Sequence, residues 1–103
     1  MTLEHWLRDR APAPPARLAR RIDEALGRRR EADATDAASL CVDAADHLLR
    51  ALLQHDSTRR ECALDLLSVD ALVTYAMEAA AEDPDTFASR VHDTMDRLAA
   101  AAQ

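Results

Sequence analysis

The segment TRRECALDLLSVDALVTYAMEAAAE, residues 58–82, is apolar on most of its sides and predicts one long central helix. Its main apolar stripe has spacings of four and three residues, which keep every member on one helical face: Cys62, Leu66, Val69, Val73, Ala76 and Ala80. A second patch on another side comprises Leu64, Leu67, Ala71 and Tyr75. We expect a neighbouring helix or a second chain to cover this patch.

The sequence also predicts where this helix begins and ends. Thr58 and Glu61 form a T-x-x-E capping box, in which each side chain binds a backbone N–H that the first turn leaves unpaired. Asp83 and Pro84 end the helix and begin the next one, as its N-cap and first helical residue. The short connection 55–57 makes the preceding helix an antiparallel partner of the central helix.

Three further helices follow from the apolar periodicity, at about 15–29, about 36–54 and 84–102. The expected inward residues are Leu18, Ile22, Ala25 and Leu26 in the first, Ala38, Cys41, Ala45, Leu48 and Leu52 in the second, and Phe87, Val91, Met95, Leu98 and Ala102 in the third. With one glycine, three aromatic residues and abundant Ala and Leu, the chain predicts an all-α fold. We expect a compact four-helix bundle around the central helix, formed by a single helical domain over residues 16–103.

Residues 1–10 predict a short extra N-terminal helix capped by Thr2, and residues 11–15, APAPP, form a Pro-rich spacer. The helix carries the only tryptophan of the chain, Trp6, with Leu3 and Leu7 on the same side. Two interpretations stay open. The large aromatic side chain docks into the core of its own chain, or the segment binds a partner or a second copy through anchors at helical spacing.

Charge is divided unevenly along the chain. Residues 1–31 hold eight arginines and five acidic residues, a net charge of +3, whereas residues 32–103 hold five arginines and fourteen acidic residues, a net charge of −9. The run Arg28–Arg30 follows a predicted helix, where cations favour the helix dipole; its alternative role is a contact for phosphate or an acidic partner. The acidic body argues against a nucleic-acid partner.

The sequence favours a cytoplasmic protein that makes no membrane contact. No segment reaches the ~18 apolar residues of a membrane span, and the first residues lack the apolar run of a signal peptide. Cys41 and Cys62 lie on apolar stripes, where a thiol reacts poorly. The predicted hairpin places them at heights roughly 10 Å apart, too far for a disulfide, so we expect two buried free thiols.

Residues that could support catalysis or bind a metal are few. Asp65 borders the buried stripe, and we expect it to pair with Arg17 or Arg90. Two Asp/His pairs with a spacing of four lie on polar helix faces, and two ligands make only half of a metal site: Asp43 with His47, and His92 with Asp96. We therefore expect no enzymatic activity, no metal and no cofactor.

Residues 66–82, LLSVDALVTYAMEAAAE, resemble the helix that follows the first aspartate-rich motif of polyprenyl synthases. The aspartate-rich motifs that hold Mg²⁺ and diphosphate in that family do not occur in this chain. The resemblance therefore implies a helix of similar composition and no shared function.

Taken together, the sequence favours a small non-enzymatic helical interaction or regulatory module. It would bind a protein partner or form a homodimer, because the basic arm of one copy complements the acidic body of another. The candidate partner contacts are Leu3, Trp6, Leu7, Arg28, Arg29 and Arg30. One alternative is a small-ligand or metal-binding bundle with an apolar cavity near Tyr75, Met77 and Met95, and another is nucleic-acid binding through residues 17–30.

Overall fold

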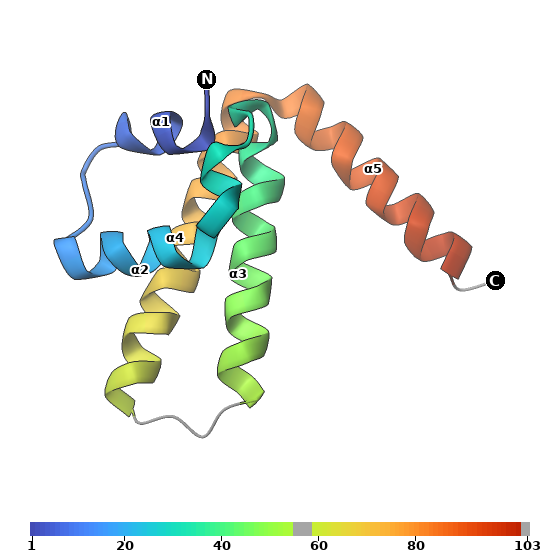
Figure 1. Ribbon diagram of the computed structural model, residues 1–103. Helices are drawn as coiled ribbons and strands as arrows, with labels where there is room; N and C mark the ends of the chain where they lie inside the picture. Colours follow the sequence, from blue (N-terminus) through green and yellow to red (C-terminus); the bar gives the residue numbers. More distant parts are fainter. Residues whose placement is uncertain (55–58, 102–103) are drawn as a thin grey trace.

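The computed structural model describes residues 1–54 and 59–101 and is built of helices (Figure 1). In chain order the elements are α1 (Leu3–Arg8), α2 (Ala16–Leu26), the 3₁₀ segments η1 (Gly27–Glu31) and η2 (Ala34–Asp36), α3 (Ala37–Gln54), α4 (Arg59–Glu82) and α5 (Pro84–Ala101). Within the described ranges there is no strand, and a single isolated bridge pairs Thr2 with Asp33. The prediction of an all-α fold is confirmed.

Local capping explains where several helices begin and end. The Thr2 hydroxyl accepts a hydrogen bond at 3.2 Å from the N–H three residues further on, and the Asp83 carboxylate accepts one from the Thr86 N–H at 3.3 Å. α2 ends before Gly27, whose φ of 54° is a conformation that residues with a Cβ rarely adopt. The caps predicted at Thr2 and Asp83 are confirmed, whereas the capping box predicted at Thr58 lies outside the described residues.

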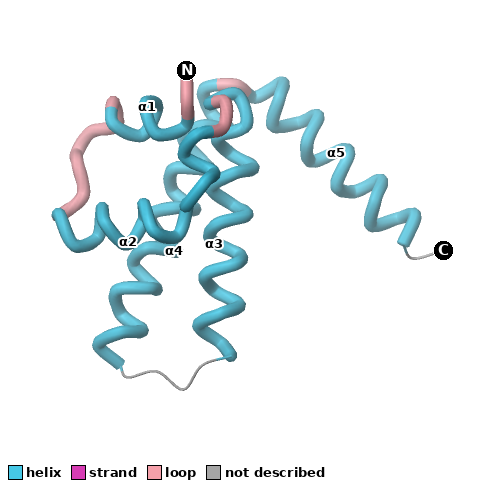
Figure 2. The backbone as a smooth tube through the Cα atoms, viewed as in Figure 1, coloured by secondary structure: helices cyan, strands magenta, loops and turns pink. Residues whose placement is uncertain are grey.

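Helices α3 and α4 form the antiparallel hairpin that the sequence predicts, and it carries most of the core (Figures 1 and 2). The α3 side of the contact contains Cys41, Ala44 and Ala45, none of which is more than 4% exposed. The α4 side contributes Leu72 and Ala76, which are 0% and 5% exposed. Small side chains dominate the contact, so the two backbones can pack closely.

The buried face of α4 differs from the predicted stripe. Leu72 and Ser68 are fully buried although neither belongs to that stripe, whereas Leu66 and Val73 are 51% and 41% exposed. The prediction was wrong at these positions because α4 is apolar on most sides, so periodicity alone does not select the packed face. Ser68 can be buried because its hydroxyl donates a hydrogen bond to the Leu64 carbonyl at 2.9 Å.

Helix α2 crosses the hairpin and contacts both of its helices (Figure 2). Ile22 and Leu26 are buried here, and two members of the second α4 patch, Ala71 and Tyr75, pack against the same core. Leu67 of that patch stays 55% exposed. The N-terminal third of the chain itself therefore covers much of the second patch.

An ion pair joins α2 to α4. Arg21 Nε donates a hydrogen bond to Asp65 Oδ1 at 2.6 Å, and both side chains are only about a quarter exposed, at 27% and 26%. The sequence pointed to Arg17 or Arg90 as the partner, which was wrong. Arg21 lies one turn beyond Arg17 on α2, at the point where the two helices cross.

Helix α5 does not complete the predicted four-helix bundle; it projects away from the hairpin (Figure 1). Val91, Met95 and Leu98, which the sequence placed inward, are 40%, 64% and 66% exposed. This part of the prediction was wrong. Two further predicted inward positions, the side chain of Phe87 and residue Ala102, lie outside the described part of the chain.

The connection between α4 and α5 explains the projection. Antiparallel helix pairs are joined by roughly two to five residues, but a single residue, Asp83, separates these helices. Because its carboxylate also caps α5, the link has no slack for α5 to turn back along α4. The Cα radius of gyration is accordingly 14.6 Å, above the roughly 13 Å of a compact domain of this length.

Candidate functional site

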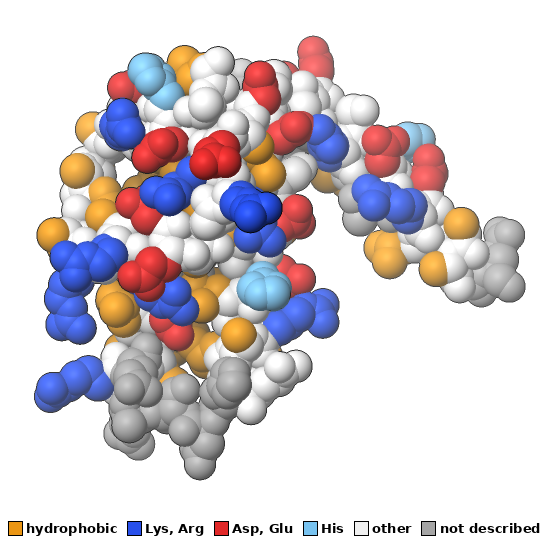
Figure 3. Space-filling model, viewed as in Figure 1, with side chains coloured by type: hydrophobic (Ala, Val, Ile, Leu, Met, Phe, Trp, Pro, Cys, Tyr) orange, Lys and Arg blue, Asp and Glu red, His pale blue; other side chains and the backbone are white. Residues whose placement is uncertain are grey.

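A groove lies in the angle between the α3–α4 hairpin and α5, where Figure 3 shows the surface hollowed. Its volume is about 750 Å³, within the roughly 300–1,000 Å³ typical of binding pockets. Helices α3, α4 and α5 all contribute to its mainly apolar lining, which includes Val42, Asp43, Val73, Met77, Val91 and Met95.

The walls of the groove carry exposed apolar side chains from three helices. Val42 on α3 is 49% exposed, Met77 on α4 is 68% exposed and Met95 on α5 is 64% exposed. A single exposed apolar residue is ordinary, but a contiguous apolar patch marks a binding surface. Methionine side chains are flexible and adapt to differently shaped partners. The composition of the walls is therefore suited to receiving apolar side chains.

The apolar surface continues along the hairpin beyond the groove. On α3, Leu49 and Leu53 follow Val42 by seven and eleven residues, and on α4, Leu66 precedes Val73 by seven. These spacings return to the same helical face, and the three leucines are 37%, 75% and 51% exposed. We call this surface the hairpin face; it consists of Val42, Leu49, Leu53, Leu66, Val73 and Met77.

Helix α5 carries a matching apolar line, the α5 stripe, which consists of Val91, Met95 and Leu98. The spacings of four and three residues place all three on one face of the helix. Val91 and Met95 line the groove, whereas Leu98 lies beyond it. Figure 3 shows hydrophobic side chains along the projecting helix, so the stripe is open to solvent.

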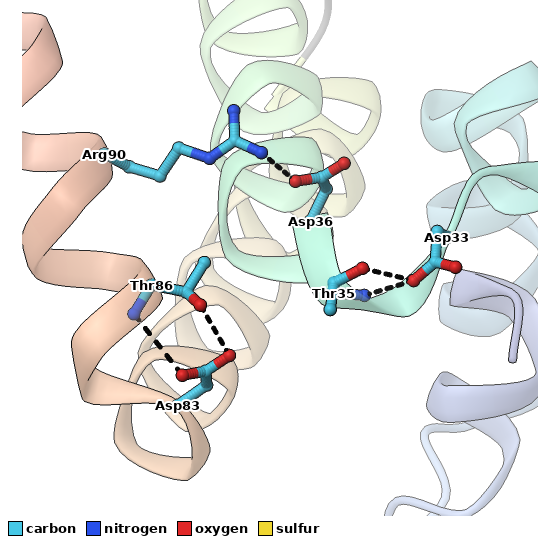
Figure 4. Close-up of polar contacts among 6 residues, drawn as sticks. All are labelled: Asp33, Thr35, Asp36, Asp83, Thr86 and Arg90. Atoms are coloured by element: carbon cyan, nitrogen blue, oxygen red, sulfur yellow. Dashed lines mark hydrogen bonds and ion pairs between the residues drawn. The ribbon is translucent and has the colours of Figure 1, made fainter.

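Polar contacts hold the first turns of α5 at their angle to the hairpin (Figure 4). Arg90 of α5 forms an ion pair with Asp36 of η2. The Asp83 carboxylate accepts hydrogen bonds from the N–H and the hydroxyl of Thr86, at 3.3 and 2.7 Å. The opening between α5 and the hairpin is therefore built into the fold of the chain.

The chain itself buries the tryptophan-bearing helix, as the first of the two interpretations expected. Trp6 is 8% exposed and Leu3 is fully buried. Trp6 Nε1 donates a hydrogen bond to Glu82 Oε2 at 3.0 Å, and the Tyr75 ring meets the indole edge-on at 6.5 Å. Arg10 stacks over the indole, with Cζ 4.1 Å from the ring centroid. Two candidate partner contacts, Leu3 and Trp6, are thus occupied by contacts within the chain.

Glu82 ties this N-terminal helix to the end of α4. It accepts from Trp6 and pairs with Arg10, which also lies 3.5 Å from Glu78. The hydrogen bonds from Trp6 and Arg10 lower the pKa of the Glu82 carboxyl. The two contacts therefore favour the ionised form of this carboxyl group.

The remaining candidate partner contacts lie away from the groove, on α1 and η1. Leu7, Arg29 and Arg30 are half-buried, and Arg28 is exposed. Arg30 Nε donates a hydrogen bond to the Gly27 carbonyl at 3.2 Å, and its guanidinium lies 3.8 Å from Glu4. The structure does not bring these residues together with the hairpin face.

Sequence reasoning missed the groove because it assigned the same apolar residues to the interior of a bundle. The periodicity of Val91, Met95 and Leu98 was recognised, but it does not tell which surface covers them. One sequence signal was available. Asp83 is the single residue between α4 and α5, and a one-residue connection is shorter than the turn between two antiparallel helices.

The two cysteines are free thiols, as predicted. Cys41 is fully buried, and burial raises the pKa of its thiol to about 12. Cys62 is only half-buried, so the prediction that both thiols are buried was wrong for this residue. A thiol that is buried and protonated at neutral pH does not act as a nucleophile, so Cys41 has a packing role in the core.

The Asp/His pairs lie on the surface. His92 Nε2 is 3.4 Å from Asp96 Oδ2, and Asp43 and His47 are both exposed. Among the residues that the structure describes, no three His, Cys, Asp or Glu side chains gather in a group that could hold a metal ion.

No family model, curated protein or solved structure matches the chain. Along residues 1–54 and 59–101, no helix combines the length and the apolar character needed to cross a membrane. The interpretation of the site therefore rests on its own geometry.

Proposed function

We propose that this chain is a small non-enzymatic interaction module that binds an amphipathic helix in the groove between the hairpin and α5. The observation that carries the proposal is that part of the hairpin face (Val42, Val73 and Met77) and part of the α5 stripe (Val91 and Met95) form two apolar walls of one open groove. Helix-in-groove recognition uses apolar side chains at the spacings i, i+3, i+4 and i+7. Exposed apolar side chains on both hairpin helices offer such a partner a continuous surface.

The polar groups near the groove support recognition rather than catalysis. Arg90 pairs with Asp36, and Asp83 caps α5, so these groups shape the groove. Catalytic pockets combine several convergent polar groups with a nucleophile, an acid or a base, whereas this lining is mainly apolar. The free thiols Cys41 and Cys62 support action in a reducing compartment such as the cytoplasm.

Fluorescence anisotropy of a labelled synthetic amphipathic helix, with leucines at i, i+4 and i+7, tests the proposal. We expect saturable binding to the wild-type chain and at least roughly tenfold weaker binding to Met77→Asp, because the new carboxylate would be buried unpaired. Leu67→Asp is the matched control, since Leu67 is 55% exposed on α4 and does not line the groove. Absence of saturable binding, or equal losses in both variants, would contradict the proposal.

The groove volume also favours a second candidate, the binding of a small apolar ligand. Met77 and Met95, near which the sequence predicted a cavity, line the groove; Tyr75 does not line it and packs against Trp6, which does. Calorimetric titration with dodecanol distinguishes the two functions. A ligand carrier would bind the alcohol with one-to-one saturation that Met77→Asp abolishes, whereas a helix-binding groove would bind the peptide and show no saturation with the alcohol.

A further inference from the structure

We propose that the helix received by the groove is α5 of a second copy of this chain, so that two copies exchange their α5 helices in a symmetric dimer. The inference rests on the proposed function, because it names the partner of the same groove. It makes the α5 stripe of one copy the ligand for the hairpin face of the other. The fourth helix that the sequence predicts for the bundle would then come from the second copy.

The α5 stripe has the form that the hairpin face requires. Val91, Met95 and Leu98 follow the i, i+4 and i+7 pattern of a helix that binds in a groove. All three are at least 40% exposed, so they are available without unfolding of the helix. Two rows of apolar side chains on α3 and α4 leave a trough between them, into which one such stripe packs as in helix bundles.

The short link at Asp83 favours a second copy over closure of α5 onto its own hairpin. One residue separates α4 from α5, and antiparallel helix pairs need roughly two to five. Closure would also break the ion pair that joins Arg90 of α5 to Asp36 of η2. Docking of an α5 from another copy leaves this ion pair intact.

The contact area suits a specific dimer. An 18-residue helix such as α5 is about 27 Å long and about 10 Å wide, so one docked helix covers a strip of about 270 Å² on each surface. Each copy in a two-fold dimer contributes one helix and one hairpin face. The buried total is then about 1,100 Å², which reaches the roughly 1,000 Å² expected of a biological interface.

The two surfaces offer one pair of opposite charges, Arg97 on α5 and Asp43 on α3. Arg97 is the only cationic residue of α5 beyond Arg90 other than His92, and it forms no ion pair within the described residues. Asp43 lies at the edge of the groove and is likewise without an ion pair in that part of the structure. Opposite charges beside matching apolar surfaces favour correct pairing over other arrangements.

Light scattering during size-exclusion chromatography of the full chain tests the exchange. We expect a wild-type dimer, and monomers for Leu98→Asp on the α5 stripe and for Met77→Asp on the hairpin face. Leu67→Asp is the control and should remain dimeric. An equimolar mixture of the two monomeric variants should form a heterodimer that is weaker than the wild-type dimer, because only one of its two contacts joins an intact α5 to an intact hairpin face. Circular dichroism confirms that these variants at exposed positions keep their helix content.

A wild-type chain that stays monomeric up to its solubility limit would overturn the exchange. So would a dimer that survives Leu98→Asp, because a dimer of hairpins packed face to face does not need α5. Failure of the proposed function is distinguishable from these results. If the synthetic helix binds a monomeric chain, the groove is a binding site for another protein; if no helix binds at all, both proposals fail.

Discussion

Replacing Trp6 by alanine is the sharpest test of how the N-terminal helix is held. The indole is 8% exposed and contacts three side chains: Glu82 at the end of α4, Tyr75 about two turns earlier in the same helix, and Arg10 after α1. Helix α1 has only six residues, so it has little stability without this anchor. Removing the ring should therefore release α1 as well as leave a cavity.

The expected cost is about 3–5 kcal/mol of unfolding free energy, the usual range for Trp→Ala in a core. A domain of this size has roughly 5–15 kcal/mol in total, so the variant should unfold at a much lower denaturant concentration. Trp6→Phe keeps most of the ring packing but loses the N–H that donates to Glu82 at 3.0 Å. Because that carboxylate is half-exposed and keeps Arg10, the phenylalanine variant should lose only roughly 1 kcal/mol.

Urea unfolding followed by circular dichroism measures both variants against wild type. If Trp6→Ala stays within about 1 kcal/mol of wild type, the internal anchor does not hold α1, and the reasoning is refuted. Tryptophan fluorescence of the wild type is an independent check, because this single indole should be shielded from acrylamide until the chain unfolds. If acrylamide quenches the indole as readily as free tryptophan, Trp6 is exposed in solution and is available to bind a partner.

Three further outcomes follow from the packing. Leu72→Ala should cost about 2–5 kcal/mol in urea unfolding because the side chain is fully buried, whereas Leu66→Ala, which is half-exposed, should cost less than about 1 kcal/mol. Asp65→Ala leaves the partly buried Arg21 only its longer, more exposed pair with Glu24 and should cost roughly 1 kcal/mol, and less at high salt concentration. The pKa of the Glu82 carboxyl is lower in the folded chain than its ordinary value of 4.5. The stabilisation from the ionised carboxylate is therefore fully present above pH 4.5 and is lost as the pH falls through the lowered pKa of the folded state. Tryptophan fluorescence should therefore report undocking of α1 in acid, and Glu82→Gln should remove this transition.

Local features of the fold were readable from the sequence because they depend on neighbouring residues. Thr2 caps α1 through an N–H three residues away, and Asp83 followed by Pro84 ends one helix and begins the next. The separation of Cys41 and Cys62 followed from counting along a hairpin, and both thiols are free. Each of these inferences needs only helix geometry and a short connection.

Features that depend on distant parts of the chain were not readable in this way. Periodicity along α4 could not choose between Leu66 and Leu72, because the choice depends on where α2 and α3 approach. The partner of Asp65 was missed for the same reason: Arg21 reaches it only at the crossing of α2 with α4. Predicting the groove requires the direction of α5. That direction depends on the one-residue link between α4 and α5 and on the ion pair between η2 and α5.

The sequence placed both the basic charge and the candidate apolar partner contacts in the N-terminal arm, residues 1–31. In the structure, the exposed apolar surface lies on α3, α4 and α5 instead. The arm carries the basic charge, but its tryptophan is used to fasten α1 to α4. The hairpin face and the α5 stripe lie in the acidic part of the chain, where a net charge of −9 over residues 32–103 opposes indiscriminate association. Nine exposed apolar side chains gathered on two matched surfaces are costly to leave in water unless a partner covers them. Under the proposed exchange, a helix held away from its own hairpin by a one-residue link would be such a partner for a second copy, because its apolar spacing and its length suit the groove.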